Sequence, residues 1–167
     1  LREKAGSISA ACLSMQAQGV SYVFYGHVGQ FLLGEDLARN GVEAALDYVL
    51  RDIEMRLESN LYLIRGSRAG DAIEAAAQVN SATDQLESLE ADAGLLADCM
   101  FRTVEDVMED LAENGDSFAP ALTLNEEEGQ LEPAGYGLLR QGALAGWAEG
   151  ESARGVNLLM GWVDADV

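Results

Sequence analysis

The spacing of apolar residues along the chain predicts several amphipathic helices, the clearest of them over residues 40–59. Within that segment apolar side chains recur every three or four positions from Val42 to Leu57, and charged side chains fill many of the positions between them. Asn40 suits a helix N-cap, and Glu43 three residues later completes a capping box. We therefore expect a helix that packs one face into a core and turns the other toward solvent.

Four more segments show helical spacing. Residues 3–17 form a short predicted helix, and a second helical stretch begins at Asp71. Residues 83–101 repeat apolar residues at intervals of three and four, as in a short coiled-coil seam. Residues 103–113 form the last strong helix, with Thr103 as its N-cap. These patterns favour helices that pack together as a bundle.

Extended structure is predicted only for short segments. Residues 20–25 are rich in β-branched and aromatic side chains, which favours a strand, although a helix remains open. Residues 121–132 suggest a small hairpin with a long loop, and Pro133 limits its second strand. Residues 156–163 suit either a helix or a strand.

The predicted fold class is mainly α: a single-domain helical bundle of about four or five helices with a minor β-hairpin element. One domain is expected over residues 1–167, with a helical body at 1–116 and a hairpin plus a glycine-rich C-terminal segment at 117–167. A chain of this length can bury roughly 70% of its unfolded surface, so it needs neither metals nor disulfides to fold.

Charge adds to this picture, because acidic residues far outnumber basic ones. The chain holds 29 acidic and 10 basic side chains, for a formal net charge of −19. Residues 71–132 alone hold 17 acidic residues, with Arg102 as the one base. Such a field repels nucleic acids and anionic membranes and favours basic partners, although adaptation to a salt-rich host is an alternative. The acidic face predicted for the helix at 103–113 consists of Glu105, Asp106, Glu109, Asp110 and Glu113.

No feature of the sequence predicts a membrane span or a secretion signal. The apolar runs fall far short of the roughly 18 residues that a membrane helix needs. We therefore expect a soluble protein, intracellular or contained in a particle such as a virion. The first residue, Leu1, reflects processing, excision from a longer chain or an unusual start codon. Cys12 and Cys99 lie among apolar residues and are expected to be small buried side chains, which mildly favours a reducing compartment.

Candidate catalytic chemistry is sparse. His27 is the single histidine, and the sequence places no serine or cysteine beside it to form a nucleophile and base pair. One histidine does not build a histidine-based metal site, and the acidic runs lack the spacing of a calcium loop. The sequence therefore predicts no catalytic residue, no metal and no cofactor.

One short turn is a candidate anion-binding site. Arg65, Ser67 and Arg68 lie between an apolar run and a predicted helix start. Free backbone N–H groups and two guanidinium groups can hold a phosphate or a carboxylate at such a place. The segment lacks the Lys-Ser/Thr ending of a phosphate-binding loop. The alternative is a turn whose arginines pair with acids of this protein or of a neighbour.

A glycine ladder near the C-terminus is the candidate interface. Gly142, Gly146 and Gly150 recur every fourth residue, so a helix would place them on one face and let another backbone approach closely. Trp147 and Trp162 nearby belong to a residue type that is enriched at binding hot spots. The alternatives are packing of this tail on its own domain, or a loop.

These observations support three functional hypotheses. The first, which we favour, is a non-catalytic assembly subunit of a larger complex or particle, for example a virion or filament component. Its partners are other protein subunits, in a homo-oligomer or a hetero-assembly, and not nucleic acid. The second is an acidic decoy or inhibitor of a basic nucleic-acid-binding protein. The third is a small-ligand binder or enzyme that uses Arg65, Arg68 and carboxylates.

Overall fold

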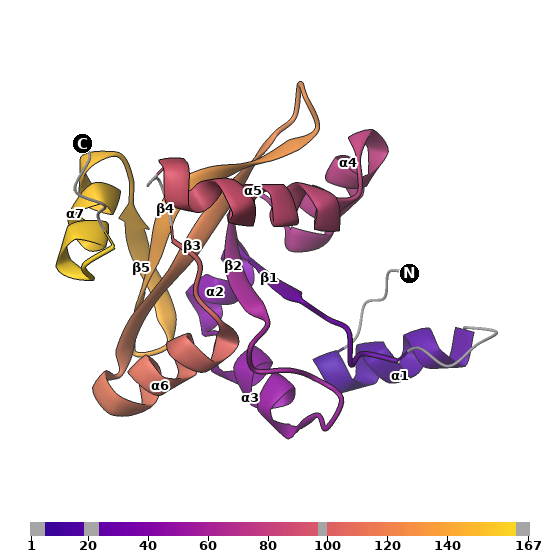
Figure 1. Cartoon of the computed structure of the whole chain (residues 1–167). Coiled ribbons are helices and arrows are strands. Elements are labelled where there is room, and N and C mark those ends of the chain that lie inside the picture. The colour runs from indigo at the N-terminus through magenta and orange to yellow at the C-terminus, as the bar shows by residue number, and fades with distance from the viewer. Residues whose placement is uncertain (1–5, 19–23, 97–99, 163–167) are drawn as a thin grey trace.

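A mixed five-stranded sheet forms the centre of the computed structural model, which describes residues 6–18, 24–96 and 100–162 (Figure 1). The strands lie side by side in sequence order. The first three run parallel to one another, and the last three pair antiparallel. The strands are β1 (Gln30–Gly34), β2 (Asn60–Arg65), β3 (Asp116–Asn125), β4 (Gln130–Arg140) and β5 (Ala143–Ala148).

Helices cover both faces of this sheet. Successive residues of β2 point to opposite faces, so Leu63 enters one apolar cluster and Tyr62 enters another. The first cluster is closed by α2, α3 and α6, the second by α4 and α5, and a third forms between α7 and Tyr136 of β4. The helices are α1 (Ile8–Gln18), α2 (Glu35–Asn40), α3 (Glu43–Arg51), α4 (Ala69–Val79), α5 (Ala82–Leu96), α6 (Val104–Asn114) and α7 (Glu151–Leu159).

The prediction of a mainly α helical bundle with a minor hairpin is wrong, because a sheet with helices on both faces organises the core. Residues 61–64 of β2 are all buried, so their side chains show no alternation and the run resembles any short apolar segment. Residues 143–148, expected in a glycine-rich tail, form the edge strand β5. The hairpin predicted at 121–132 is present, as part of the longer β3–β4 pair.

The described part of the segment at residues 20–25, for which a strand was predicted, is not a strand. Residues 19–23 lie outside the described residues, and residues 24–25 belong to no strand. The segment at 156–163 was predicted to be either a helix or a strand. Its residues 156–159 form the C-terminal end of α7.

The helix predicted over residues 40–59 is replaced by two shorter ones. Asn40 is the last residue of α2 rather than an N-cap, and its side-chain amide donates to the carbonyl oxygen of Asp36 at 2.7 Å. Gly41 then adopts a φ of 114°, which few residues other than glycine tolerate. This turn separates α2 from α3, which begins at Glu43 without a side-chain cap.

The early end of α3 leaves an apolar residue in solvent. α3 stops at Arg51, and Asp52 follows in an extended conformation. Ile53 is therefore fully exposed, although its spacing predicts a place on the buried stripe. Leu57 still packs against the first cluster. Ile53 thus lies exposed just after the end of α3.

The helix predicted at 103–113 is confirmed as α6. The Thr103 hydroxyl accepts a hydrogen bond from the backbone N–H of Asp106 at 3.1 Å, and the Asp106 carboxylate accepts one from the N–H of Thr103 at 2.8 Å. This reciprocal pair is a capping box. Gly115 ends the helix in the left-handed conformation, with a φ of 75°.

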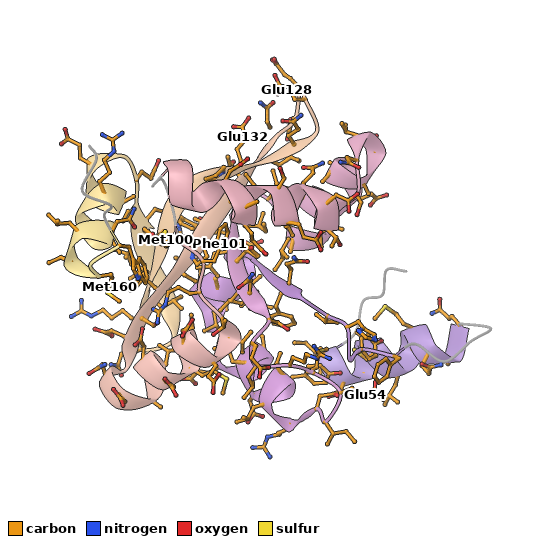
Figure 2. All side chains as sticks on the ribbon, viewed as in Figure 1. Glu54, Met100, Phe101, Glu128, Glu132 and Met160 are labelled. Carbon is orange, nitrogen blue, oxygen red and sulfur yellow. The ribbon has the colours of Figure 1, made fainter. Side chains whose placement is uncertain are left out.

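The β3–β4 hairpin carries an exposed acidic turn at its tip. Figure 2 shows Glu128 at the end of the hairpin and Glu132 on the strand that returns from it. The Asn125 side chain accepts hydrogen bonds from the N–H groups of Glu127 and Glu128, at 3.2 and 3.3 Å, and donates one to Glu132 at 2.8 Å. Asn125 therefore fixes the turn, and the acidic run at 126–128 points into solvent.

α1 is the helix least integrated into the fold. It extends away from the sheet and contacts α3 (Figure 1). Ile8 packs against the edge of the first cluster, yet no residue of α1 is buried. Among the described helices, none is both long and apolar enough to cross a membrane.

Candidate functional site

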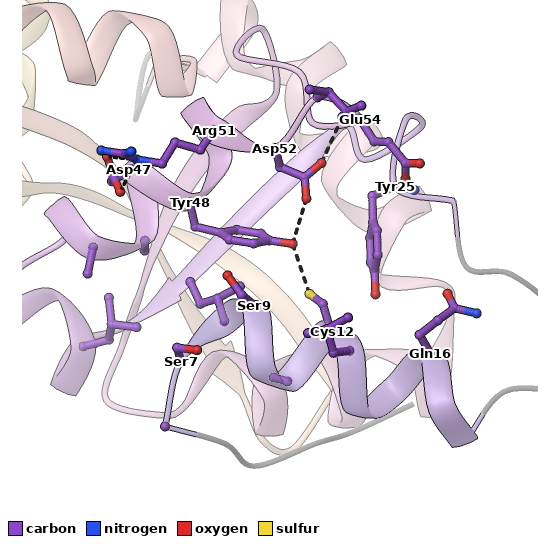
Figure 3. Close-up of a pocket in the computed structure, with 18 of the residues that line it drawn as sticks. Ser7, Ser9, Cys12, Gln16, Tyr25, Asp47, Tyr48, Arg51, Asp52 and Glu54 are labelled. Atoms are coloured by element: carbon purple, nitrogen blue, oxygen red, sulfur yellow. Dashed lines mark hydrogen bonds and ion pairs between the residues drawn. The ribbon is translucent and has the colours of Figure 1, made fainter.

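A large hollow lies between α1 and α3. It has a volume of about 1070 Å³ and is open to solvent. Figure 3 shows its two walls, the α1 helix on one side and α3 with the segment that follows it on the other. We call this hollow the α1–α3 groove. The residues on which its chemistry depends are Cys12 and Leu13 from α1, Tyr25, Tyr48 from α3, and Asp52, Ile53 and Glu54.

A short hydrogen-bonded chain crosses the groove. The Tyr48 hydroxyl lies 3.0 Å from Oδ2 of Asp52 and 3.3 Å from Sγ of Cys12 (Figure 3). Because this hydroxyl has one hydrogen and the carboxylate is the stronger acceptor, Tyr48 donates to Asp52 and accepts from the Cys12 thiol. Oδ1 of Asp52 also accepts a hydrogen bond from the N–H of Glu54 at 2.9 Å. The chain links α1 to α3 and to the turn behind it.

The two tyrosines of the groove stay protonated at neutral pH. Burial raises the pKa of Tyr48 well above its usual range, and its contacts with Cys12 and Asp52 raise it further. Burial also raises the pKa of Tyr25, as do the neighbouring Cys12 thiol and the Asp52 and Glu54 charges. The groove therefore presents neutral phenols beside carboxylates, and neither phenol is activated as a base.

Exposed apolar side chains also line the groove, beside polar residues such as Asp47 and Arg51. Leu13 on α1 is 71% exposed, and Ile53 on the opposite wall is fully exposed. Leu37 of α2 lines the same hollow and is 39% exposed. Large apolar side chains gathered around one hollow on a protein surface are typical of interaction sites.

The described residues that line the groove include no histidine. His27 is exposed and lies edge-on to Phe24, with 5.6 Å between ring centres, outside the groove. Within the described residues, no group of three or more histidines, cysteines or carboxylates is gathered to hold a metal ion. The arrangement offers apolar contact and hydrogen-bonding groups at one end.

The predicted anion-binding residues lie in a turn whose hydrogen-bond donors pair with acidic side chains of this chain. Arg65 forms an ion pair with Glu149 and lies over the ring of Trp147, 5.4 Å from its centre. The backbone N–H of Gly66 donates to Oε2 of Glu35 at 2.8 Å. That hydrogen bond lowers the pKa of Glu35, and the hydrogen bond from Arg39 lowers it further.

Arg65 and its neighbours lie outside the α1–α3 groove. Arg68 is exposed and precedes α4, and Ser67 lies between it and Gly66. The geometry favours the alternative of a turn paired with internal acids. Anion binding by Arg65, Ser67 and Arg68 stays a prediction.

Of the five acidic residues predicted to form a face on α6, three are exposed. Asp106 is used in the capping box. Asp110 accepts hydrogen bonds from the buried Arg102 guanidinium at 2.6 Å and from the Ser117 hydroxyl at 2.9 Å. Glu105, Glu109 and Glu113 remain exposed along the outer side of the helix.

The predicted glycine ladder does not lie on a helix. Gly142 is in the β4–β5 turn with a φ of 72°, Gly146 is in β5, and Gly150 precedes α7 with a φ of 51°. Positive φ values at two of the three show that turns, and not close helix packing, need these glycines. The helical premise of the interface is therefore wrong.

The two tryptophans belong to different packing clusters. Trp147 packs against the first cluster, and Trp162 against the third, with its ring centre 5.9 Å from that of Phe118. Both are half-buried. Their participation in one contact surface stays a prediction, and the structure does not bring them together.

Sequence reasoning missed the α1–α3 groove. Cys12 and Tyr48 lie 36 residues apart, and each resembles an ordinary core residue in the sequence. Cys12, which was expected to be buried, is half-buried and forms no disulfide bond. Cys99 lies outside the described residues. One available signal was α1 itself, a helix without a single charged side chain.

Comparison with known proteins gives two matches. A family model described as the spore germination protein N-terminal domain matches residues 1–124. A solved structure titled "Crystal Structure of the GerBC protein" aligns with a TM-score of 0.59 and 20% sequence identity, over 90% of this chain and 42% of that chain. This chain thus spans less than half the length of the GerBC protein, with which it shares a fold. Among curated proteins, none matches the sequence.

Proposed function

Because this chain belongs to the spore germination protein N-terminal domain family, we propose that it acts as a non-catalytic, protein-binding domain of a germinant receptor subunit. The family model covers residues 1–124, which include both walls of the α1–α3 groove. A domain of such a receptor acts by contacting the other proteins of the complex. The partner is therefore a protein, and the domain turns over no substrate.

The α1–α3 groove is the observation that carries this proposal. Its exposed apolar walls, with Leu13 on one side and Ile53 on the other, are costly to leave in water. A partner that covers these side chains removes their apolar surface from water. The domain needs no further folding to present them. The polar end, with Asp52 and Glu54, adds directional contacts that distinguish one partner from another.

The family assignment and the fold narrow the three hypotheses drawn from the sequence. A virion or filament component finds no support in a spore germination family, and we do not propose it. The acidic decoy is not favoured, because the described acids of residues 71–132 do not share one face: they lie on α4 and α5 over one face of the sheet, on α6 over the other, and on the β3–β4 hairpin. The ligand-binding hypothesis at Arg65 is less favoured, because the Arg65 guanidinium already pairs with Glu149.

Deletion of the gene in a spore-forming host tests the proposal. Mutant spores should form in normal numbers but respond poorly to nutrients, measured as a slower fall in optical density. A wild-type copy should restore the response. If spores without the protein germinate at the wild-type rate in every nutrient tested, a receptor role is excluded.

A further inference from the structure

We propose that the α1–α3 groove receives an amphipathic helix with a basic flank, supplied by a partner protein. The proposal rests on the proposed function, since it names the kind of partner that the receptor-subunit domain would bind.

α1 is a helix whose apolar surface is only partly covered within the described residues, by the contacts of Ile8 with the first cluster and of Cys12 with Tyr48. Its eleven residues include no charged side chain, and its apolar residues are spread around the whole circumference. A helix of that composition is ordinarily buried on most sides. Yet none of its residues is buried, and Leu13 is 71% exposed. A second surface is therefore expected to pack on α1.

The opposite wall of the groove also carries exposed apolar side chains, beside its charged residues. Ile53 is fully exposed and Leu37 is 39% exposed, and Ala44 and Ala45 of α3 form part of the floor between them and α1. Leu13 and Ile53 thus line one hollow from two sides. A hollow between two helical walls, with an exposed apolar side chain on each wall, suits an apolar stripe with residues at positions i, i+3, i+4 and i+7 of a bound helix.

Charge decides which kind of helix fits. The groove is lined by three carboxylates, Asp47, Asp52 and Glu54, and by one cation, Arg51. Arg51 is already engaged by Asp47, at 2.8 Å. α1 adds no charge to the other wall. Asp52 accepts hydrogen bonds from the neutral Tyr48 hydroxyl and the Glu54 N–H, and Glu54 accepts one from the Tyr25 N–H at 3.2 Å. The negative potential at the Asp52 end attracts lysine or arginine on the flank of the bound helix, and the net charge of −19 steers such a partner toward the protein.

The same charges argue against two other occupants. A second copy of this chain would bring another net charge of −19 to the groove, so self-association there is opposed by repulsion. A nucleic acid or an anionic lipid surface is repelled for the same reason. A basic amphipathic helix is the occupant that satisfies both the apolar walls and the acidic end.

The test uses synthetic peptides of about 15 residues, a length at which a helix begins to be stable. The probe peptide has a leucine stripe at helical spacing and lysine on its flanks. One comparison peptide carries glutamate in place of lysine, and another has the same leucines and lysines in scrambled order. Binding to the full chain is measured by fluorescence anisotropy, and hydrogen exchange of the α1 amides locates the contact.

The lysine probe should bind and slow hydrogen exchange in α1, while the glutamate and scrambled peptides should bind at least about tenfold more weakly. Ile53→Ser and Leu13→Ser should each weaken probe binding by about tenfold, because each removes one buried apolar side chain from the contact. The matched control is Leu159→Ser on α7, where the leucine is 88% exposed and remote from the groove. This control should leave binding unchanged.

Glu54→Gln should weaken binding of the lysine probe, and Glu113→Gln, at an exposed acid on α6, should not. Equal binding of the scrambled peptide, or equal loss in Ile53→Ser and Leu159→Ser, would mean that charge alone attracts the probe and would overturn the proposal. A concentration-dependent rise in mass that Ile53→Ser abolishes would assign the groove to a second copy, which overturns it also. Neither result bears on germination, so a failed groove and a failed receptor role are told apart.

Discussion

Tyr48 on α3 reaches Cys12 on α1, with 3.3 Å between the phenol oxygen and the sulfur, and the same hydroxyl donates to Asp52 at 3.0 Å. This is a polar link between two helices whose apolar contact is thin, since α1 buries none of its residues. It holds the wall of the groove in place. The position of α1 therefore depends on a few side chains, and substitutions there should act on α1 more than on the global fold.

Tyr48→Phe should loosen α1 without unfolding the sheet. The change removes one hydroxyl, worth about 1 kcal/mol of hydrogen bonding, which corresponds to roughly fivefold faster opening of the contact. Hydrogen exchange of the α1 amides is the measurement. Tyr62→Phe is the control, because the Tyr62 hydroxyl donates to Glu90 on the opposite face. If α1 amides exchange at the same rate in both variants, the Tyr48 link does not hold α1.

Arg102→Met should destabilise the whole domain. Arg102 is buried, and it donates to the Asp110 carboxylate at 2.6 Å and to the carbonyl oxygen of Phe118 at 3.2 Å. Removing one partner of such a pair costs about 3 kcal/mol, because the remaining groups lose their hydrogen bonds. Urea unfolding monitors the change. Arg51→Met, which breaks the exposed pair with Asp47, should change stability little; comparable losses in both variants would contradict the importance of burial.

Glu35→Gln should make the stability of the domain less dependent on pH in the acid range. The hydrogen bond from the Gly66 N–H, followed by that from Arg39, holds the pKa of Glu35 below its ordinary value. A carboxyl with a lowered pKa in the folded state contributes stability above its unfolded pKa, and that contribution is lost as the pH falls through the folded pKa. Wild type should therefore exceed Glu35→Gln in unfolding free energy at pH 7, and the difference should shrink as the pH falls below 4.5 and vanish once the folded-state carboxyl is protonated. A difference that persists in acid would assign the effect to packing instead.

Gly135→Ala should be far more damaging than Gly146→Ala, although both glycines lie in the β4–β5 part of the sheet. Gly135 has a φ of 74°, and a Cβ there would lie 2.1 Å from the carbonyl oxygen of Ala148. At Gly146 the backbone is not in the left-handed region and no atom lies within 4 Å of an added Cβ. We expect a loss of at least about 2 kcal/mol for the first and little change for the second, by thermal or urea unfolding. Similar losses at both positions would refute this distinction.

The parts of the fold that follow local rules could be predicted from the sequence. Thr103, Asp106 and Gly115 define the two ends of α6, because a capping box and a left-handed glycine act within one turn. The β3–β4 hairpin is likewise a local pairing. Features set by neighbours a few residues away are the ones that a single sequence reveals.

The parallel strands and the groove could not be predicted in this way. β2 lies between β1 and β3, partners that are distant in the sequence, and its burial on both faces erases the alternation that marks a strand. The glycine ladder was misinterpreted because a spacing of four fits both a helix face and successive turns, and the φ values of Gly142 and Gly150 decide for turns. The groove joins Cys12 to Tyr48, a contact between segments for which the sequence holds no local signal.

Germination of spores that carry groove variants is the most direct test of a protein-binding role for this domain. The chromosomal gene is replaced by the double variant Leu13→Ser/Ile53→Ser or by the control Leu159→Ser, and protein levels are matched by immunoblot. The account predicts that the double variant slows the nutrient-triggered fall in optical density toward that of the deletion mutant, while the control germinates like wild type. Wild-type germination in the double variant would contradict the account.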